Sequence, residues 1–129
     1  GPRTEKRKKK RYPGSFHVEV NCAAHGTPQG GVAVNIGEKG VGISGTKPLE
    51  PGSEVSITFH FDNSPGKKTT ETVKGIVKWN QKMGPYYTSG VELEEPVNGN
   101  DHFMILSQIQ MAKNEETDPA PWTERENPG

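Results

Sequence analysis

The sequence predicts an all-β domain of six short antiparallel strands followed by one helix. Apolar and polar side chains alternate with a period of two through the middle of the chain, as in strands with one buried face. Turn-forming residues interrupt this pattern about every ten to fifteen residues, the spacing of strands joined by short loops. Such strands pair antiparallel in a sandwich or a barrel, and closure into a barrel removes the edges that invite aggregation.

The first two strands are expected over residues 16–22 and 32–36. In the second, Val32, Val34 and Ile36 alternate with Ala33 and Asn35. This parity predicts that Asn35 lies on the face opposite the apolar one, where it is available to solvent or to a ligand.

The remaining strands show the same alternation. They are expected at residues 41–43, 55–61, 73–79 and 87–93, separated by glycine- and proline-containing turns. Gly75 interrupts the fifth segment, which predicts a bend or a β-bulge at that position.

One helix is expected after the last strand. Phe103, Leu106 and Ile109 fall at helical spacing, which predicts that they form its buried face. Asn100 or Asp101 is a suitable N-terminal cap. So short a helix has to dock on the sheet to be stable.

Composition divides the chain into three parts. Residues 1–14 form a basic arm and residues 114–129 an acidic tail, both expected to be flexible because they hold little that can be buried. Residues 1–11 carry a net charge of +6 and residues 115–129 a net charge of −4. The barrel and helix are therefore assigned to residues 15–113, enough for one modest domain.

Several classes of protein are disfavoured by the residue content. Cys22 is the only cysteine, which excludes an internal disulfide and predicts a reducing, cytoplasmic location. No apolar run approaches the length of a membrane span, and no signal peptide is visible. The four histidines lack metal-ligand spacing and no nucleophile motif is present, so we expect neither a metal site nor catalytic residues.

The basic run at residues 7–11 is the first candidate site. A lysine-rich run is often only a solvated tail, but here arginines stand at both ends. Arginine is planar and binds phosphate or a guanine edge through two hydrogen bonds at once, whereas lysine is a point charge. Arg3 and Arg7 have the same spacing as Arg7 and Arg11. We favour the second pair because Arg11 lies nearest the first strand.

The glycine-rich turn at residues 35–40 is the second candidate site. A structural interpretation is that its glycines merely permit a positive φ. The turn is too short for a dinucleotide-binding fingerprint and lacks the lysine of a P-loop. Trp79, Tyr86 and Tyr87 are further candidates, either as stacking partners for a base or as packing residues.

These motifs resemble those of the PilZ domain family, bacterial receptors for the second messenger cyclic di-GMP. That family carries RxxxR before its first strand and [D/N]xSxxG after its second, and residues 7–11 and 35–40 stand in these places. Residues 90–93 match the family's G-[V/I]-x-hydrophobic element, and Trp79 fits the end of the penultimate strand. The resemblance covers residues 5–110 and implies a six-stranded antiparallel β-barrel with a C-terminal helix.

The resemblance also implies roles for single residues. Arg7 and Arg11 would bind the phosphates and the guanine Hoogsteen edges of the ligand, with Lys8 as a neighbouring basic residue. Asn35 would bond a guanine through its amide. Gly40 would let the backbone turn close to the ligand.

Gly37 departs from the family pattern. The family has Ser at this position, and its hydroxyl contacts the ligand. Loss of one hydrogen bond to a charged group is worth about 1.5–3 kcal/mol, which would weaken binding roughly 10–100-fold. We therefore keep Gly37 among the site residues and expect reduced affinity.

The predicted function is a cyclic di-GMP receptor or effector module, not an enzyme, with no metal or further cofactor. Binding would order the arginine arm over the barrel face that carries Asn35 and so signal to a partner protein or a neighbouring domain. One alternative is a degenerate PilZ module that binds a protein but no nucleotide. The other is a basic arm that binds anions or nucleic acid without specificity. The Asn35 turn has no role in that case, so nucleic acid is disfavoured.

Overall fold

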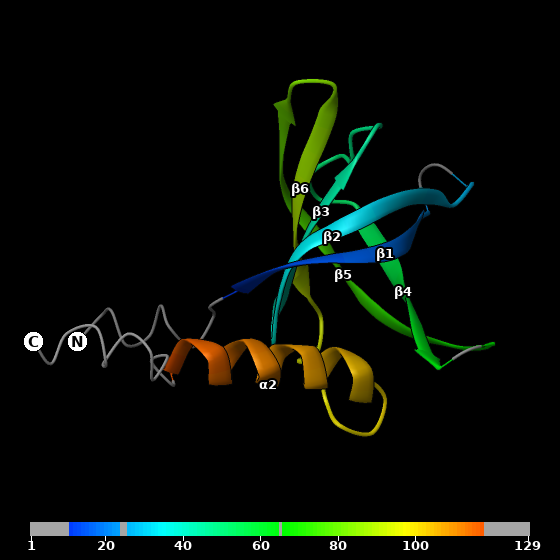
Figure 1. Ribbon diagram of the computed structural model, residues 1–129. Coiled ribbons are helices and arrows are strands. Elements are labelled where there is room, and N and C mark those ends of the chain that lie inside the picture. The colour runs from blue at the N-terminus through cyan, green and yellow to red at the C-terminus, as the bar shows by residue number, and fades with distance from the viewer. Residues whose placement is uncertain (1–10, 24–25, 65, 118–129) are drawn as a thin grey trace, which may run out of the picture.

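In the described part of the chain, six antiparallel strands close into a barrel and one helix lies across its end (Figure 1). The computed structural model describes residues 11–23, 26–64 and 66–117. The order around the barrel is β1-β2-β3-β6-β5-β4. The elements are β1 (Arg11–Cys22), β2 (Gln29–Gly37), β3 (Gly40–Gly45), β4 (Glu54–Ser64), β5 (Lys67–Met83), β6 (Tyr86–Leu93) and α2 (Phe103–Thr117). The predicted fold class is confirmed.

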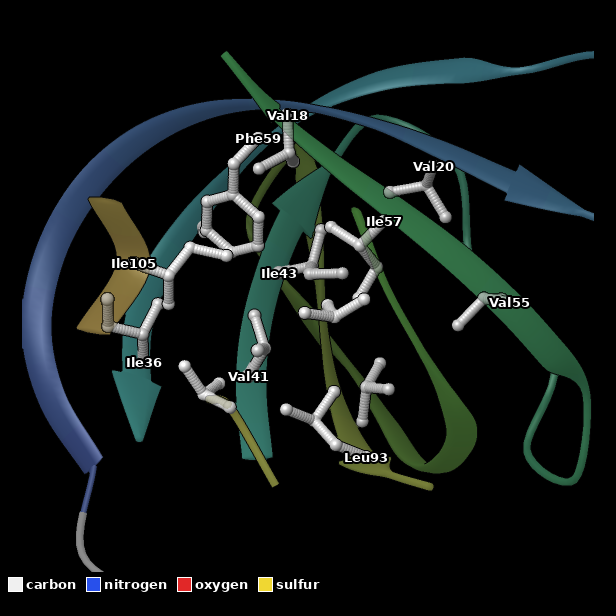
Figure 2. Packing of buried hydrophobic residues seen from close by; sticks show 14 of the residues in the cluster. Val18, Val20, Ile36, Val41, Ile43, Val55, Ile57, Phe59, Leu93 and Ile105 are labelled. Carbon is white, nitrogen blue, oxygen red and sulfur yellow. The ribbon is translucent and has the colours of Figure 1, made fainter. Parts of the chain in front are cut away.

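The barrel interior is filled by the inward side chains of all six strands. Phe59 is fully buried at the centre of an aromatic cluster, with its ring 6.2 Å from that of Phe16 and 6.1 Å from that of Phe61. Figure 2 shows Ile105 of α2 beside Ile36 and Phe59 at one end of this core. Each fully buried side chain of this size contributes about 1.5–3 kcal/mol, so the core is the main source of stability.

The helix turns a different face to the barrel than its periodicity predicts. Ile105 and Ile109 are buried, whereas Phe103 is 64% exposed. The prediction that Phe103 belongs to the buried face is wrong. The reason lies in how the start of the helix is held, because a contact from the barrel fixes the rotation of α2 about its axis.

That contact is the carboxylate of Glu71, from the first half of β5. Its two oxygens accept hydrogen bonds from the backbone N–H groups of Met104, at 2.6 Å, and Ile105, at 2.9 Å. A buried carboxylate at a helix N-terminus satisfies two orphan donors and complements the helix dipole. The cap is therefore not Asn100 or Asp101, as the sequence suggested, but a residue from β5.

His102 provides a second link between the helix and β5. Its Nδ1 accepts a hydrogen bond from the backbone N–H of Asn98, so its Nε2 carries the proton and donates to the carbonyl oxygen of Thr72, at 3.0 Å. Asn98 also stabilises the turn that precedes the helix, because its Oδ1 accepts hydrogen bonds from the backbone N–H groups of Asn100 and Asp101.

The barrel begins earlier and the helix ends later than predicted. Residues 11–14 belong to β1, and Tyr12 packs against the core. The helix continues to Thr117, past the expected boundary at residue 113. Because these segments are ordered by pairing and docking, composition alone placed both boundaries too far inward. Residues 1–10 and 118–129, which hold most of the predicted arm and tail, lie outside the described residues.

β-Bulges interrupt the regular register at positions that the sequence did not mark. Val34 has no place in the β2–β3 ladder, and Lys78 has none in the β5–β6 ladder. Gly75, where a bend or bulge was predicted, pairs regularly with Val55 and Leu93. A methyl group there would stand 2.3 Å from the carbonyl oxygen of Glu92, so Gly75 permits close strand approach instead.

Candidate functional site

Four of the predicted site residues come together on the outer surface of the barrel. Arg11 pairs with Gly37 across β1 and β2, and Asn35 pairs with Gly42 across β2 and β3. Gly37 ends β2 and Gly40 begins β3, and a short turn joins them. The chain therefore unites Arg11, Asn35, Gly37 and Gly40 on three neighbouring strands. Arg7 and Lys8, the other predicted site residues, lie outside the described part of the chain.

The guanidinium of Arg11 lies flat over Gly40. A methyl group at position 40 would stand 2.7 Å from Arg11 Nη2 and 2.8 Å from its Nε. Neither Gly37 nor Gly40 has a positive φ; among the described residues, the glycines that do are Gly26, Gly52, Gly66 and Gly84. In this structure the absence of a side chain at Gly40 thus leaves space for Arg11, and no unusual backbone conformation requires it.

Asn35 lies over a second glycine. A methyl group at Gly42 would stand 2.6 Å from Asn35 Nδ2 and 2.7 Å from its Oδ1. Val41 and Ile43 on either side of Gly42 point into the core, so Gly42 and Asn35 face outward. Asn35 thus lies on the predicted face.

The alternation of inward and outward side chains along β2 nevertheless differs from the one that the prediction assumed. Ala33, which was expected on the outer face, is fully buried, as is Ile36. The bulge at Val34 shifts the alternation between them, and this shift turns Asn35 outward.

Trp79 lies over a third glycine, Gly90. As with Asn35, a β-bulge turns its side chain outward. A methyl group at Gly90 would stand 2.2 Å from Trp79 Nε1. The bulge at Lys78 follows the buried Val77, so Trp79 points outward, with 43% of its surface exposed. Sequence reasoning left the role of Trp79 open, and strand alternation alone would have placed it with Val77 in the core.

These residues form one continuous row across five strands. Successive ladder pairs join Pro13 to Asn35, Asn35 to Gly42, Gly42 to Gly90 and Gly90 to Trp79. We call these residues, together with Arg11 and Gly40 beside them, the outer row. Sequence reasoning missed Gly42 as a site residue. The available signal was a glycine between two core residues of one strand, since such a glycine leaves space on the outer face for a neighbouring side chain.

Two polar groups on this face, the guanidinium of Arg11 and the side-chain oxygen of Asn35, lack partners among the described residues. The guanidinium of Arg11 makes no hydrogen bond or ion pair with another described residue, and burial lowers its pKa. Arginine remains charged nonetheless. Asn35 Oδ1 is buried and has no hydrogen-bond partner among the described residues. A half-buried cation and a buried acceptor without partners, on adjacent strands, are the arrangement expected of a site that a ligand completes.

The turn between β2 and β3 is fixed by hydrogen bonds from residues that follow in the chain. Its backbone carbonyls at Glu38 and Lys39 accept hydrogen bonds from the N–H groups of Val97 and Leu93, each at 2.9 Å. The carboxylate of Glu38 also binds Lys113 of α2, at 2.6 Å, and this hydrogen bond raises the pKa of Lys113. The turn is thus positioned before any ligand arrives, which lowers the entropic cost of binding.

Comparison with known proteins identifies the family. The family model for the PilZ domain matches residues 5–109. The chain belongs to the PilZ domain family. PilZ domains are generally receptor modules for cyclic di-GMP, and they are binding modules rather than enzymes. No curated protein matches the sequence significantly.

Two solved structures resemble this PilZ domain. The first is the Bacillus subtilis inhibitor of motility (MotI/DgrA), with a TM-score of 0.65 and 12% identity over 84% of this chain and 52% of that one. The second is the PilZ domain of CeSA from a cellulose-synthesizing bacterium, with a TM-score of 0.49 and 17% identity over 81% of this chain and 98% of that one. The chain spans about half the length of MotI/DgrA, and at this identity the likeness concerns the fold. Within the described residues, no helix is long and apolar enough to cross a membrane.

Proposed function

We propose that this PilZ domain is a receptor module for cyclic di-GMP that binds the ligand on its outer row. The observation that carries the proposal is the pair of unpartnered polar groups, the guanidinium of Arg11 and the buried Oδ1 of Asn35, on the face where the family motifs meet. The ligand has two phosphates and two guanines, which are the groups that these side chains bind best.

Each residue has a distinct role in this proposal. Arg11 binds a phosphate or the Hoogsteen edge of a guanine, and Arg7 binds a second such group from the arm. The amide of Asn35 bonds the edge of a guanine, and the exposed indole of Trp79 offers an aromatic face at the other end of the outer row.

Binding would have a structural consequence for the arm. Arg7 and Lys8 belong to a segment of high positive charge, which ligand phosphates would neutralise. Ordering of this segment over the outer row would be the output, read by a neighbouring domain or a protein partner. Since the ligand is a bacterial second messenger, the proposal places the domain in the bacterial cytoplasm.

A thermal-shift screen against several cyclic dinucleotides tests the ligand. The melting temperature should rise with cyclic di-GMP by mass action, and the rise should be smaller in Arg7→Ala and Arg11→Ala. A chain that is stabilised equally by every anion would instead support the non-specific basic arm. Its affinity would fall steeply with salt and would be insensitive to Asn35→Ala.

A second candidate function is protein recognition without nucleotide, and Gly37 favours it because the family hydroxyl is missing there. Gly37→Ser distinguishes the two. On the receptor proposal this change restores a hydrogen bond and tightens cyclic di-GMP binding roughly tenfold or more. No binding by either the wild type or Gly37→Ser would favour the protein-interaction module.

A further inference from the structure

A small basic hollow lies beside Arg11, along one side of the outer row. Its volume is about 220 Å³, and it is lined by Arg11, Lys39, Gly40, Lys78 and Glu92. Sites that enclose a whole small-molecule ligand usually measure about 300–1,000 Å³. This hollow has room for a group of a ligand such as a phosphate, while the remainder lies on the open barrel face.

The hollow is built from cations around one carboxylate. Arg11, Lys39 and Lys78 outnumber Glu92, so an additional negative charge is favoured there. Gly40, over which Arg11 lies, is the direct ladder partner of Glu92. An anion that replaces the Glu92 carboxylate in the hollow would therefore meet Arg11 and Lys78 together.

Lys78 reaches this hollow because of a β-bulge. The ladder pairs Val77 with Val91 and then Trp79 with Gly90, which leaves Lys78 without a place in the register. Both Lys78 and Trp79 are exposed as a result. Bulges re-aim side chains and are over-represented next to functional sites. Here one bulge brings a cation and an aromatic ring to the same face.

The present partner of Lys78 is weak. Its Nζ lies 3.6 Å from Glu92 Oε1, and the two side chains are 57% and 59% exposed. Exposed ion pairs of this kind contribute little to stability and are screened by salt, so breaking this pair costs little. Glu92 therefore neutralises part of the hollow in the free protein without closing it.

We propose that Lys78 is a phosphate-binding residue of this domain, and that Glu92 is its counter-ion until the ligand phosphate displaces it. This inference rests on the proposed cyclic di-GMP function and adds a charged contact that the family motifs do not contain. Such a contact offsets the missing hydroxyl at Gly37, since a hydrogen bond from a cation to phosphate is stronger than one from a neutral hydroxyl.

Calorimetric titration of the full chain with cyclic di-GMP tests the inference. Lys78→Met keeps the aliphatic stem and removes the charge, and it should weaken binding about tenfold. Glu92→Gln removes the competing carboxylate and should tighten binding about threefold. Lys74→Met is the matched control, because Lys74 is an exposed lysine of β5 that does not line the hollow. It should bind as the wild type does.

The outcomes separate this inference from the proposed function. Wild-type binding that Lys78→Met leaves unchanged, or that Glu92→Gln weakens, overturns the role of Lys78 alone. Absence of any binding by the wild type overturns both. Inorganic phosphate, titrated at the same concentration, should give no saturable heat because it cannot also reach Asn35. Equal binding of phosphate and cyclic di-GMP would make the hollow a general anion site and contradict the inference.

Discussion

Polar side chains on the inner and outer sides of the same strands differ in whether they have hydrogen-bond partners. Within the described residues, the buried polar side chains of the interior and the helix dock all have partners: Glu71 accepts two backbone N–H groups, His102 bonds two backbone groups, and Ser89 bonds Asn80. On the outer row, the guanidinium of Arg11 and the Oδ1 of Asn35 have no partner among these residues. Since native proteins satisfy nearly all buried polar groups, the difference separates the part built for stability from the part built for binding.

The largest effect on the inner side is expected from Phe59→Ala. Removing this fully buried ring leaves a cavity next to Phe16 and Phe61 and should lower the free energy of unfolding by about 3–5 kcal/mol. Urea denaturation measures it. His60→Ala, an exposed neighbour on β4, is the control and should change stability by less than about 0.5 kcal/mol. Similar losses in both variants would mean that the inner face is assigned wrongly.

The next largest effect is expected from Glu71→Gln. The amide keeps the size of the carboxylate but can accept through only one oxygen, so one helix N–H loses its partner and the charge on the helix dipole is lost. Unfolding free energy should fall by about 1–3 kcal/mol. Hydrogen exchange at Met104 and Ile105 should accelerate. Unchanged exchange there would show that Glu71 does not cap α2.

Gly42→Ala addresses the outer side. The new methyl group would displace the Asn35 amide, so affinity for cyclic di-GMP should fall about tenfold while the fold persists. Gly30→Ala is the matched control, because Gly30 is also a strand glycine and a methyl group there meets no atom within 4 Å. If the two variants bind equally, the position of Asn35 over Gly42 does not matter for binding.

The smallest effect is expected from Lys113→Met, which removes the ion pair that links α2 to the β2–β3 turn. A partly exposed pair of this kind should contribute less than about 1 kcal/mol at neutral pH. Because the folded-state pKa of Lys113 is raised, this contribution is complete below its unfolded pKa of 10.5 and is lost as the pH rises through the folded value.

Denaturation at increasing pH measures that effect. The stability difference between the wild type and Lys113→Met should shrink in the alkaline range above pH 10.5. Lys47→Met, at an exposed loop lysine, controls for the loss of a charge. A difference that grows with pH would contradict the assigned ion pair.

The sequence predicted the fold well because strand alternation and turns are local signals. The Glu71 cap could not be predicted, since it joins β5 to a helix more than thirty residues later. The bulges at Val34 and Lys78 were also invisible, because a single extra residue shifts the alternation without changing composition. Asn35 was placed on the correct face because Asn35 and the buried Ile36 both follow the bulge, so the alternation between these two residues is regular. Trp79 could not be assigned to a face, because the bulge at Lys78 separates it from the buried Val77.

The central claim is that the unpartnered groups of the outer row are completed by cyclic di-GMP, and isothermal titration of the wild type and Arg11→Ala tests it most directly. The wild type should give saturable heat. Arg11→Ala should give much less heat at the same ligand concentration, while without ligand it melts at an unchanged temperature, because Arg11 bonds no other described residue through its side chain. Absence of heat from the wild type at high-micromolar ligand, or equal heat from both proteins, would contradict the claim.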